Sequence, residues 1–162
     1  MGTIIILLTF ISLASPALAE SEKVYSYVEL FDKTDDELLI DYEHAKVHML
    51  PYAYKMEVCD SDSELYCFSS NRLWFSIPKY DVQVGDTWIA QGVEYTLKNN
   101  GLELLGYDDI YLIDASYTNV KAPKTISSFY YSEANGLLVA NITITNTKPY
   151  TLILKSKAGF PK

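Results

Sequence analysis

The sequence predicts an all-β domain of mainly antiparallel strands, built as a curved sheet, a half-barrel or a sandwich with at most one short helix. Three observations lead to this prediction. Apolar and polar residues alternate with a period of two along most of the chain. Turn-forming residues recur roughly every eight to twelve positions. Tyrosine, which fits half-buried strands well, occurs 14 times.

The first 19 residues predict a secretory signal peptide that is not part of this domain. They carry no charged side chain, contain the apolar run 4–11 and end in the small-x-small pattern Ala-Leu-Ala at 17–19. A membrane anchor is the alternative, because no basic residue precedes the apolar run. The run is shorter than the roughly 20 apolar residues of a spanning helix. We therefore expect a signal peptide over 1–19 and a single β-rich domain over 20–162, secreted or periplasmic and not membrane-spanning.

The net charge of −8 excludes one class of partner. Residues 20–64 hold 13 acidic and 4 basic side chains, and residues 65–162 hold 8 and 9. Neither part forms the basic stripe that nucleic-acid binding requires. The acidic half favours solubility, with a cationic partner or Ca²⁺ as the alternative.

The two cysteines, Cys59 and Cys67, predict a disulfide. An even, closely spaced pair in an exported chain is first of all a structural bridge. The residues between them are polar and turn-forming, so the cysteines can lie opposite each other on two hairpin arms. A redox or metal role would need a C-x-x-C spacing or nearby histidines, and the sequence has neither.

Residues 24–31 alternate as a strand and 32–36 form a polar turn, but the next segment is ambiguous. As a helix, 37–50 has a capping box that begins at Thr34, an apolar stripe and a stop at Pro51. As two strands, it places His44 and His48 on an outer face. The strand-like neighbours on both sides favour the second interpretation.

From residue 52 onward the strand pattern is steady, and it is clearest over residues 126–154. There, Asn135-Gly136 supplies a hairpin turn, and Lys148-Pro149 interrupts a second pair of strands. The segments expected as strands before this region are 52–58, 65–69, 72–77, 87–90, 93–97, 102–105 and 111–117.

Three short motifs together resemble small exported bacterial proteins that are largely uncharacterised. The hairpin motif also looks like the final strands of half-barrel proteins related to periplasmic lipoprotein carriers. This resemblance implies a curved antiparallel sheet with a groove, and it brings no catalytic residues. The motifs are Cys67-Phe68-Ser69-Ser70 leading to Ile77-Pro78-Lys79, then Gly85-Asp86-x-Trp88, then Phe129-Tyr130-Tyr131-Ser132 before Gly136-Leu137-Leu138.

The sequence shows no constellation that predicts catalysis, a cofactor or a metal. His44 and His48 would lie about 13 Å apart on a strand, and only a helix would bring them together with Asp41. Asp60, Asp62 and Glu64 lack the turn glycine and the distant glutamate of a calcium loop. No G-x-S-x-G elbow, Cys–His pair or phosphate-binding glycine loop occurs. We therefore expect no enzyme.

Two functions remain open. The first is a non-catalytic binding module for an apolar or amphipathic ligand, because tyrosines suit a half-polar groove. The second is an envelope or secreted protein that contacts another protein through an edge strand or a flat face. The apolar face of the late strands needs a cover, which a second sheet, a partner chain or a ligand would supply. The expected ligand-binding residues are Phe129, Tyr131, Leu138, Ile142, Tyr111 and Trp88.

Overall fold

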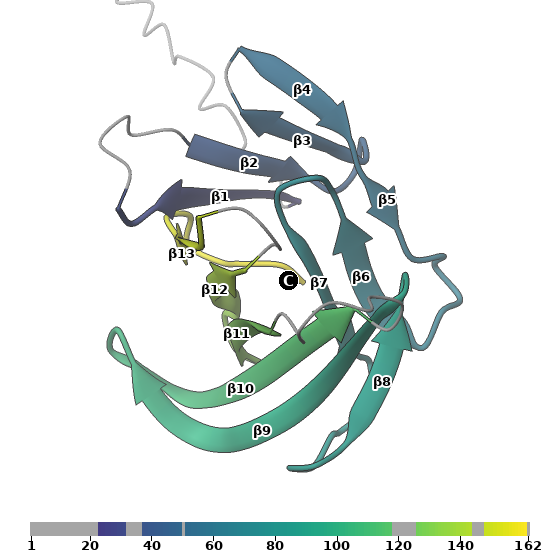
Figure 1. Ribbon diagram of the computed structural model, residues 1–162, viewed down its shortest axis with the longest axis vertical. Coiled ribbons are helices and arrows are strands. Elements are labelled where there is room, and N and C mark those ends of the chain that lie inside the picture. The colour runs from purple at the N-terminus through teal and green to yellow at the C-terminus, as the bar shows by residue number, and fades with distance from the viewer. Residues whose placement is uncertain (1–22, 32–36, 50, 118–125, 144–147, 162) are drawn as a thin grey trace, which may run out of the picture.

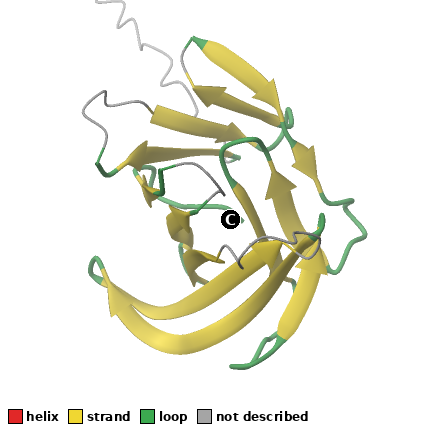
Figure 2. Cartoon of the chain, in the orientation of Figure 1, coloured by secondary structure: helices red, strands yellow, loops and turns green. Residues whose placement is uncertain are grey.

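The computed structural model describes residues 23–31, 37–49, 51–117, 126–143 and 148–161. The described residues form strands, turns and loops and no helix (Figure 2), which confirms the all-β prediction. None of them forms a helix long and apolar enough to cross a bilayer. The strands are β1 (Val24–Glu29), β2 (Glu37–Asp41), β3 (Lys46–Met49), β4 (Tyr52–Lys55), β5 (Glu57–Val58), β6 (Leu65–Ser69), β7 (Trp74–Pro78), β8 (Thr87–Ala90), β9 (Val93–Leu104), β10 (Tyr107–Tyr117), β11 (Ile126–Ser132), β12 (Gly136–Ile142) and β13 (Tyr150–Leu154).

Ten of these strands form one antiparallel sheet, in the order β4-β3-β2-β1-β13-β12-β11-β10-β9-β8. The last strand, β13, lies between β1 and β12, so it joins the first four strands to the last five. Tyr27 of β1 pairs with Leu154, and Val139 of β12 pairs with Ile153. The remaining strands, β5, β6 and β7, form a small second sheet.

The large sheet is strongly curved, and the small sheet lies across its open side (Figure 1). The curvature is greatest in the long hairpin of β9 and β10, where the pairing register shifts three times. Extra residues in a strand bend it and increase its twist. The large sheet does not close into a barrel, because β4 and β8 are its edges.

The core lies between the two sheets. Phe75 of the small sheet packs on Phe129 and Tyr131 of the large sheet, with ring centroids 5.3 and 5.8 Å apart. Both phenylalanines are fully buried. A second sheet, not a helical layer, therefore covers the apolar face of the late strands.

Residues 37–49 are two strands, and the helix alternative is wrong. Strand β2 pairs with β1 on one side and β3 on the other, with Ile40 opposite both Tyr25 and Val47. Ile40 and Val47 are fully buried. Because alternate residues bury one face against the core, the strand pairing wins over the local helix signal.

The disulfide and the hairpin turn at Gly136 form as predicted, but the break predicted near Gly101 does not. Cys59 and Cys67 form a disulfide with a Cα–Cα distance of 5.2 Å, as expected, at the β5–β6 hairpin. Gly136 opens β12 with a φ of 78°, as a hairpin turn requires. The break expected between 93–97 and 102–105 is wrong, because β9 runs through both. Gly101, at a φ of 67°, bends the strand without ending it.

Candidate ligand-binding cleft

The tip of the β9–β10 hairpin is shaped by unusual backbone conformations. Leu105 and Gly106 have φ angles of 55° and 81°, the left-handed pair that a two-residue turn needs. Two residues later β10 bulges, and Asp109 takes a φ of 53°. Aspartate tolerates this conformation better than most residues. The bulge redirects the side chains of β10 on one face of the hairpin.

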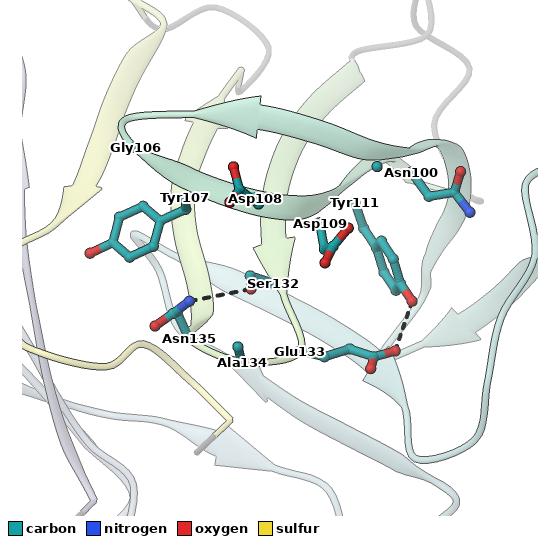
Figure 3. Close-up of a pocket in the computed structure, with 11 residues that line it drawn as sticks. Asn100, Gly106, Tyr107, Asp108, Asp109, Tyr111, Ser132, Glu133, Ala134 and Asn135 are labelled. Carbon is teal, nitrogen blue, oxygen red and sulfur yellow. Dashed lines mark hydrogen bonds between the residues drawn. The ribbon is translucent and has the colours of Figure 1, made fainter.

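Opposite this hairpin lies the turn between β11 and β12, and the two enclose a cleft of about 720 Å³ (Figure 3). We call it the acidic lobe, because Asp108, Asp109 and Glu133 line it together with Tyr107 and Asn135. In Figure 3, Asp109 points into the space between the hairpin and the turn. No Lys or Arg belongs to the described residues that line this lobe.

Tyr111 and Glu133 form the wall at one end of the acidic lobe. The Tyr111 hydroxyl donates a 2.7 Å hydrogen bond to the Glu133 carboxylate (Figure 3). This bond to a carboxylate, helped by burial, raises the pKa of Tyr111 to about 12. Tyr111 is therefore a neutral donor at physiological pH, and it holds Glu133 in one position.

A second, smaller cleft of about 210 Å³ lies on the other side of this pair, and Tyr111 and Glu133 line both clefts. We call it the tyrosine lobe, because Tyr66, Tyr80 and Tyr131 also line it. The buried side chains of Ile77, Pro78 and Val82 contribute apolar surface to it.

Two charged residues, Lys79 and Asp81, also line the tyrosine lobe. The Lys79 ammonium is 5.1 Å from the centroid of the Tyr66 ring and donates a 3.0 Å hydrogen bond to the Ser61 carbonyl. This distance suits a cation–π interaction. The tyrosines here can therefore accommodate an ammonium group on their ring faces.

The two lobes differ in what they can bind. The acidic lobe offers three carboxylates and several hydrogen-bond acceptors, so it attracts cations and hydroxyl or amine donors and repels anions. The tyrosine lobe offers ring faces and aliphatic carbons, which attract apolar groups. Side by side, they suit a ligand with a polar head and an apolar body.

The six residues expected to bind ligand do not lie together. Tyr111 and Tyr131 meet at the tyrosine lobe, with ring centroids 6.2 Å apart. Phe129, Ile142 and Trp88 are buried in the core between the sheets. Leu138 lies in a separate cluster with Ile110 and Val139.

Sequence reasoning missed most of the cleft. Tyr107, Asp109 and Glu133 were not expected as site residues, although Asp108-Asp109 follows a turn glycine and Glu133 lies in a turn. Their separation along the chain hid the relationship. Only the pairing of Ile110 with Ser132 brings the bulge and the turn together.

The two histidines lie at the β2–β3 turn and within β3. His44 Nδ1 lies 2.9 Å from both carboxylate oxygens of Asp41, at the turn between β2 and β3. His48 lies within β3, opposite Leu39. Among the described residues, no group of three or more His, Cys, Asp or Glu is arranged to hold a metal ion.

Comparisons with known proteins give no match: no protein-family model, no curated protein and no solved structure matches the chain.

Proposed function

We propose that this protein is a non-catalytic binding module for an amphipathic ligand, bound across the acidic and tyrosine lobes. One observation carries the proposal. Tyr111 and Glu133, joined by a hydrogen bond, line both lobes, so a single ligand can contact carboxylates on one side and tyrosine rings on the other. The interior offers less support as a site, because Phe129, Ile142 and Trp88 are packed there against other side chains.

The charge of the acidic lobe selects the head group. A ligand carboxylate, as in a fatty acid, would lie near Asp108, Asp109 and Glu133 and be repelled. A cationic head would be attracted to the same carboxylates. Because Asp109 and Glu133 are exposed, this attraction is screened by salt, and we expect modest affinity that falls as ionic strength rises.

The tyrosine lobe selects the apolar body. Its volume of about 210 Å³ accepts a short alkyl chain or a small ring against Tyr66 and Tyr131. The Tyr131 hydroxyl stays neutral, because burial and then the charge of Glu133 raise its pKa to about 12. Tyr131 therefore contributes apolar contact without adding a negative charge to those of Asp81 and Glu133, which line the same lobe.

Three probes with the same alkyl chain test this proposal: octyltrimethylammonium, octyl glucoside and octyl sulfate, each titrated below its micelle concentration. Calorimetry or tyrosine chemical shifts should show saturable binding of octyltrimethylammonium and none of octyl sulfate. Equal binding of the ammonium and sulfate probes, or no saturable binding of any probe, would overturn the proposal. Saturable binding of octyl glucoside alone would contradict the proposed cationic head group and indicate a hydroxyl-rich head group.

Matched variants locate the site. Asp109→Asn keeps the left-handed backbone and removes one charge, so octyltrimethylammonium should bind a few-fold more weakly, since an exposed charge pair contributes less than about 1 kcal/mol. Asp62→Asn removes one charge from the exposed loop between the cysteines and should leave the affinity unchanged. Equal losses in both variants would indicate a net-charge effect and not a site.

We also propose that the protein acts outside the cytoplasm, secreted or periplasmic. The Cys59–Cys67 disulfide fits an oxidising environment. The signal peptide expected over residues 1–19 lies outside the described residues.

A second candidate function is protein–protein contact through β4. This strand is an edge of the ten-stranded sheet, and all four of its residues are exposed. Tyr52 and Tyr54 lie side by side there, with ring centroids 6.3 Å apart. An unpaired edge can add a strand from a partner. A partner on β4 would protect its amides from exchange, whereas a cleft ligand would not.

A further inference from the structure

The segment after β13 returns to the interior. Lys155 N and Ser156 N both donate hydrogen bonds to the Ser26 carbonyl, at 2.8 and 3.3 Å. The chain then inserts Phe160, only 1% exposed, into an aromatic socket. The Phe160 ring lies 4.8 Å from the rings of Tyr42 and Phe68 and 5.9 Å from that of Tyr25, measured between centroids.

This segment also grips the start of β12. Gly159 N donates a 2.7 Å hydrogen bond to the Asn135 carbonyl, and Leu137 N donates a 2.7 Å bond to the Phe160 carbonyl. The buried hydroxyl of Tyr27 completes the arrangement. It donates to the Leu137 carbonyl at 3.0 Å and accepts from Phe160 N at 3.3 Å. We call these four hydrogen bonds the clasp.

Two glycines permit the clasp. A Cβ atom at Gly136 would lie 2.0 Å from the Gly159 carbonyl oxygen, and one at Gly159 would lie 2.1 Å from the Leu137 carbonyl oxygen. Both atoms are backbone, so neither can move aside without breaking the clasp. Gly136 also has a φ of 78°, which disfavours any other residue.

The clasp lies beside the cleft. Asn135 lines the acidic lobe and belongs to the same turn as Glu133, two residues earlier. The turn itself has one backbone hydrogen bond of its own, from Asn135 N to the Ser132 carbonyl at 3.2 Å. The far end of the turn is held by the β11–β12 ladder, in which Ser132 pairs with Gly136, and by the clasp to Gly159 and Phe160.

We infer that the segment 156–161 is a positioning element of the cleft: by clasping Asn135 and Leu137, it holds the turn so that Glu133 meets Tyr111. Phe160 acts as the anchor, because its burial pins Gly159 against Gly136. The role in ligand binding rests on the proposed function, but the effect on Glu133 does not. Phe160 and Gly159 touch no ligand, so they position the site and do not form it.

The pKa of Tyr111 reports the position of Glu133, since the Glu133 hydrogen bond is the largest cause of its rise to about 12. We expect Phe160→Ala and Gly159→Ala to lower it toward the ordinary value of 10, measured by NMR titration of tyrosine ring carbons and assigned with Tyr111→Phe. Leu73→Ala is the control, because Leu73 is as buried as Phe160 but lies outside the clasp. It should destabilise the fold and leave the pKa of Tyr111 unchanged.

A milder variant keeps the inference testable if the first two do not fold. Tyr27→Phe removes only the hydroxyl that joins Leu137 to Phe160 and leaves the ring in the core. It should lower the pKa of Tyr111 in the same direction, and amide exchange at Leu137 and Gly159 should accelerate together. An unchanged Tyr111 titration in every folded clasp variant would overturn the inference.

Ligand binding separates the two proposals. If octyltrimethylammonium binds the wild type, clasp variants should bind it a few-fold more weakly, because they displace the exposed carboxylate of Glu133. Loss of affinity with an unchanged Tyr111 pKa would contradict the clasp and leave the proposed function intact. A lowered pKa in a protein that binds no probe would support the clasp and contradict the proposed function.

Discussion

The hydroxyl of Tyr111 donates a hydrogen bond to Glu133, 22 residues away in the sequence. The two meet because Ile110, the residue before Tyr111, pairs with Ser132, the last residue of β11 and the residue before Glu133. This bond joins the acidic lobe to the tyrosine lobe. Because the bond raises the pKa of Tyr111, the titration of Tyr111 reports whether the bond is formed.

The substitution Glu133→Gln should lower the pKa of Tyr111 from about 12 toward 10. The amide still accepts a hydrogen bond, but it lacks the charge that opposes a second negative group. NMR titration of the tyrosine ring carbons measures the change. Glu103→Gln, an exposed site on β9, serves as the control and should have no effect. If Glu133→Gln leaves the pKa of Tyr111 unchanged, the Glu133 charge does not raise that pKa.

Alkaline pH should destabilise the protein between about pH 10 and 12. Tyr111, Tyr131 and Tyr150 all have pKa values raised to about 12, mainly by the Glu133 hydrogen bond for the first and by burial for the other two. The folded state therefore keeps protons that the unfolded state releases near pH 10. Their contribution to stability is complete below pH 10 and is lost as pH rises through 12. Urea unfolding across this range measures it, and a flat profile would contradict the shifts.

Two glycine substitutions should separate backbone strain from steric clash. Gly106→Ala and Gly136→Ala both replace a glycine with positive φ, at 81° and 78°. A Cβ at Gly106 meets open space, so the first should cost only about 1–2 kcal/mol. The second also meets the Gly159 carbonyl at 2.0 Å and should cost distinctly more. Denaturant midpoints compare them. If the two substitutions lower the free energy of unfolding equally, the Gly159 carbonyl moves away from the new Cβ without cost, and the steric clash is not real.

Reduction of the Cys59–Cys67 bond should lower the free energy of unfolding by roughly 2–3 kcal/mol, the loop-entropy value for so short a loop. Unfolding with and without a reductant measures this difference, with the double substitution to serine as an independent check. Thiol labelling of the native protein should detect no free cysteine. Two reactive thiols per chain would contradict the disulfide.

Mature protein should begin at Glu20. Small residues at 17 and 19 suit a signal-peptide cleavage site, so export should remove residues 1–19. N-terminal sequencing of material recovered from the periplasm or the medium tests this prediction. Exported protein that begins at Met1 would contradict it.

The sequence by itself determined the local features. Alternating residues such as Val93, Tyr95 and Leu97 predicted a strand because a strand places every second side chain on one face. Cys59 and Cys67 predicted a disulfide because a short polar loop lets two hairpin arms face each other. Gly136 predicted a hairpin turn because the necessary conformation is local to one residue.

Tertiary structure alone decided the rest, because it depends on contacts between distant segments. The ambiguity over residues 37–50 was resolved by β2 pairing with β1 and β3, an effect that a local helix signal does not contain. Phe160 carried no sequence signal at all, and it is buried because Tyr25, Tyr42 and Phe68 surround it. The cleft required the register shift in β10 next to Asp109 and the pairing of Ile110 with Ser132, which together bring Asp109 and Glu133 to one cleft. Register is a property of two strands together, so no single stretch of the chain reveals it.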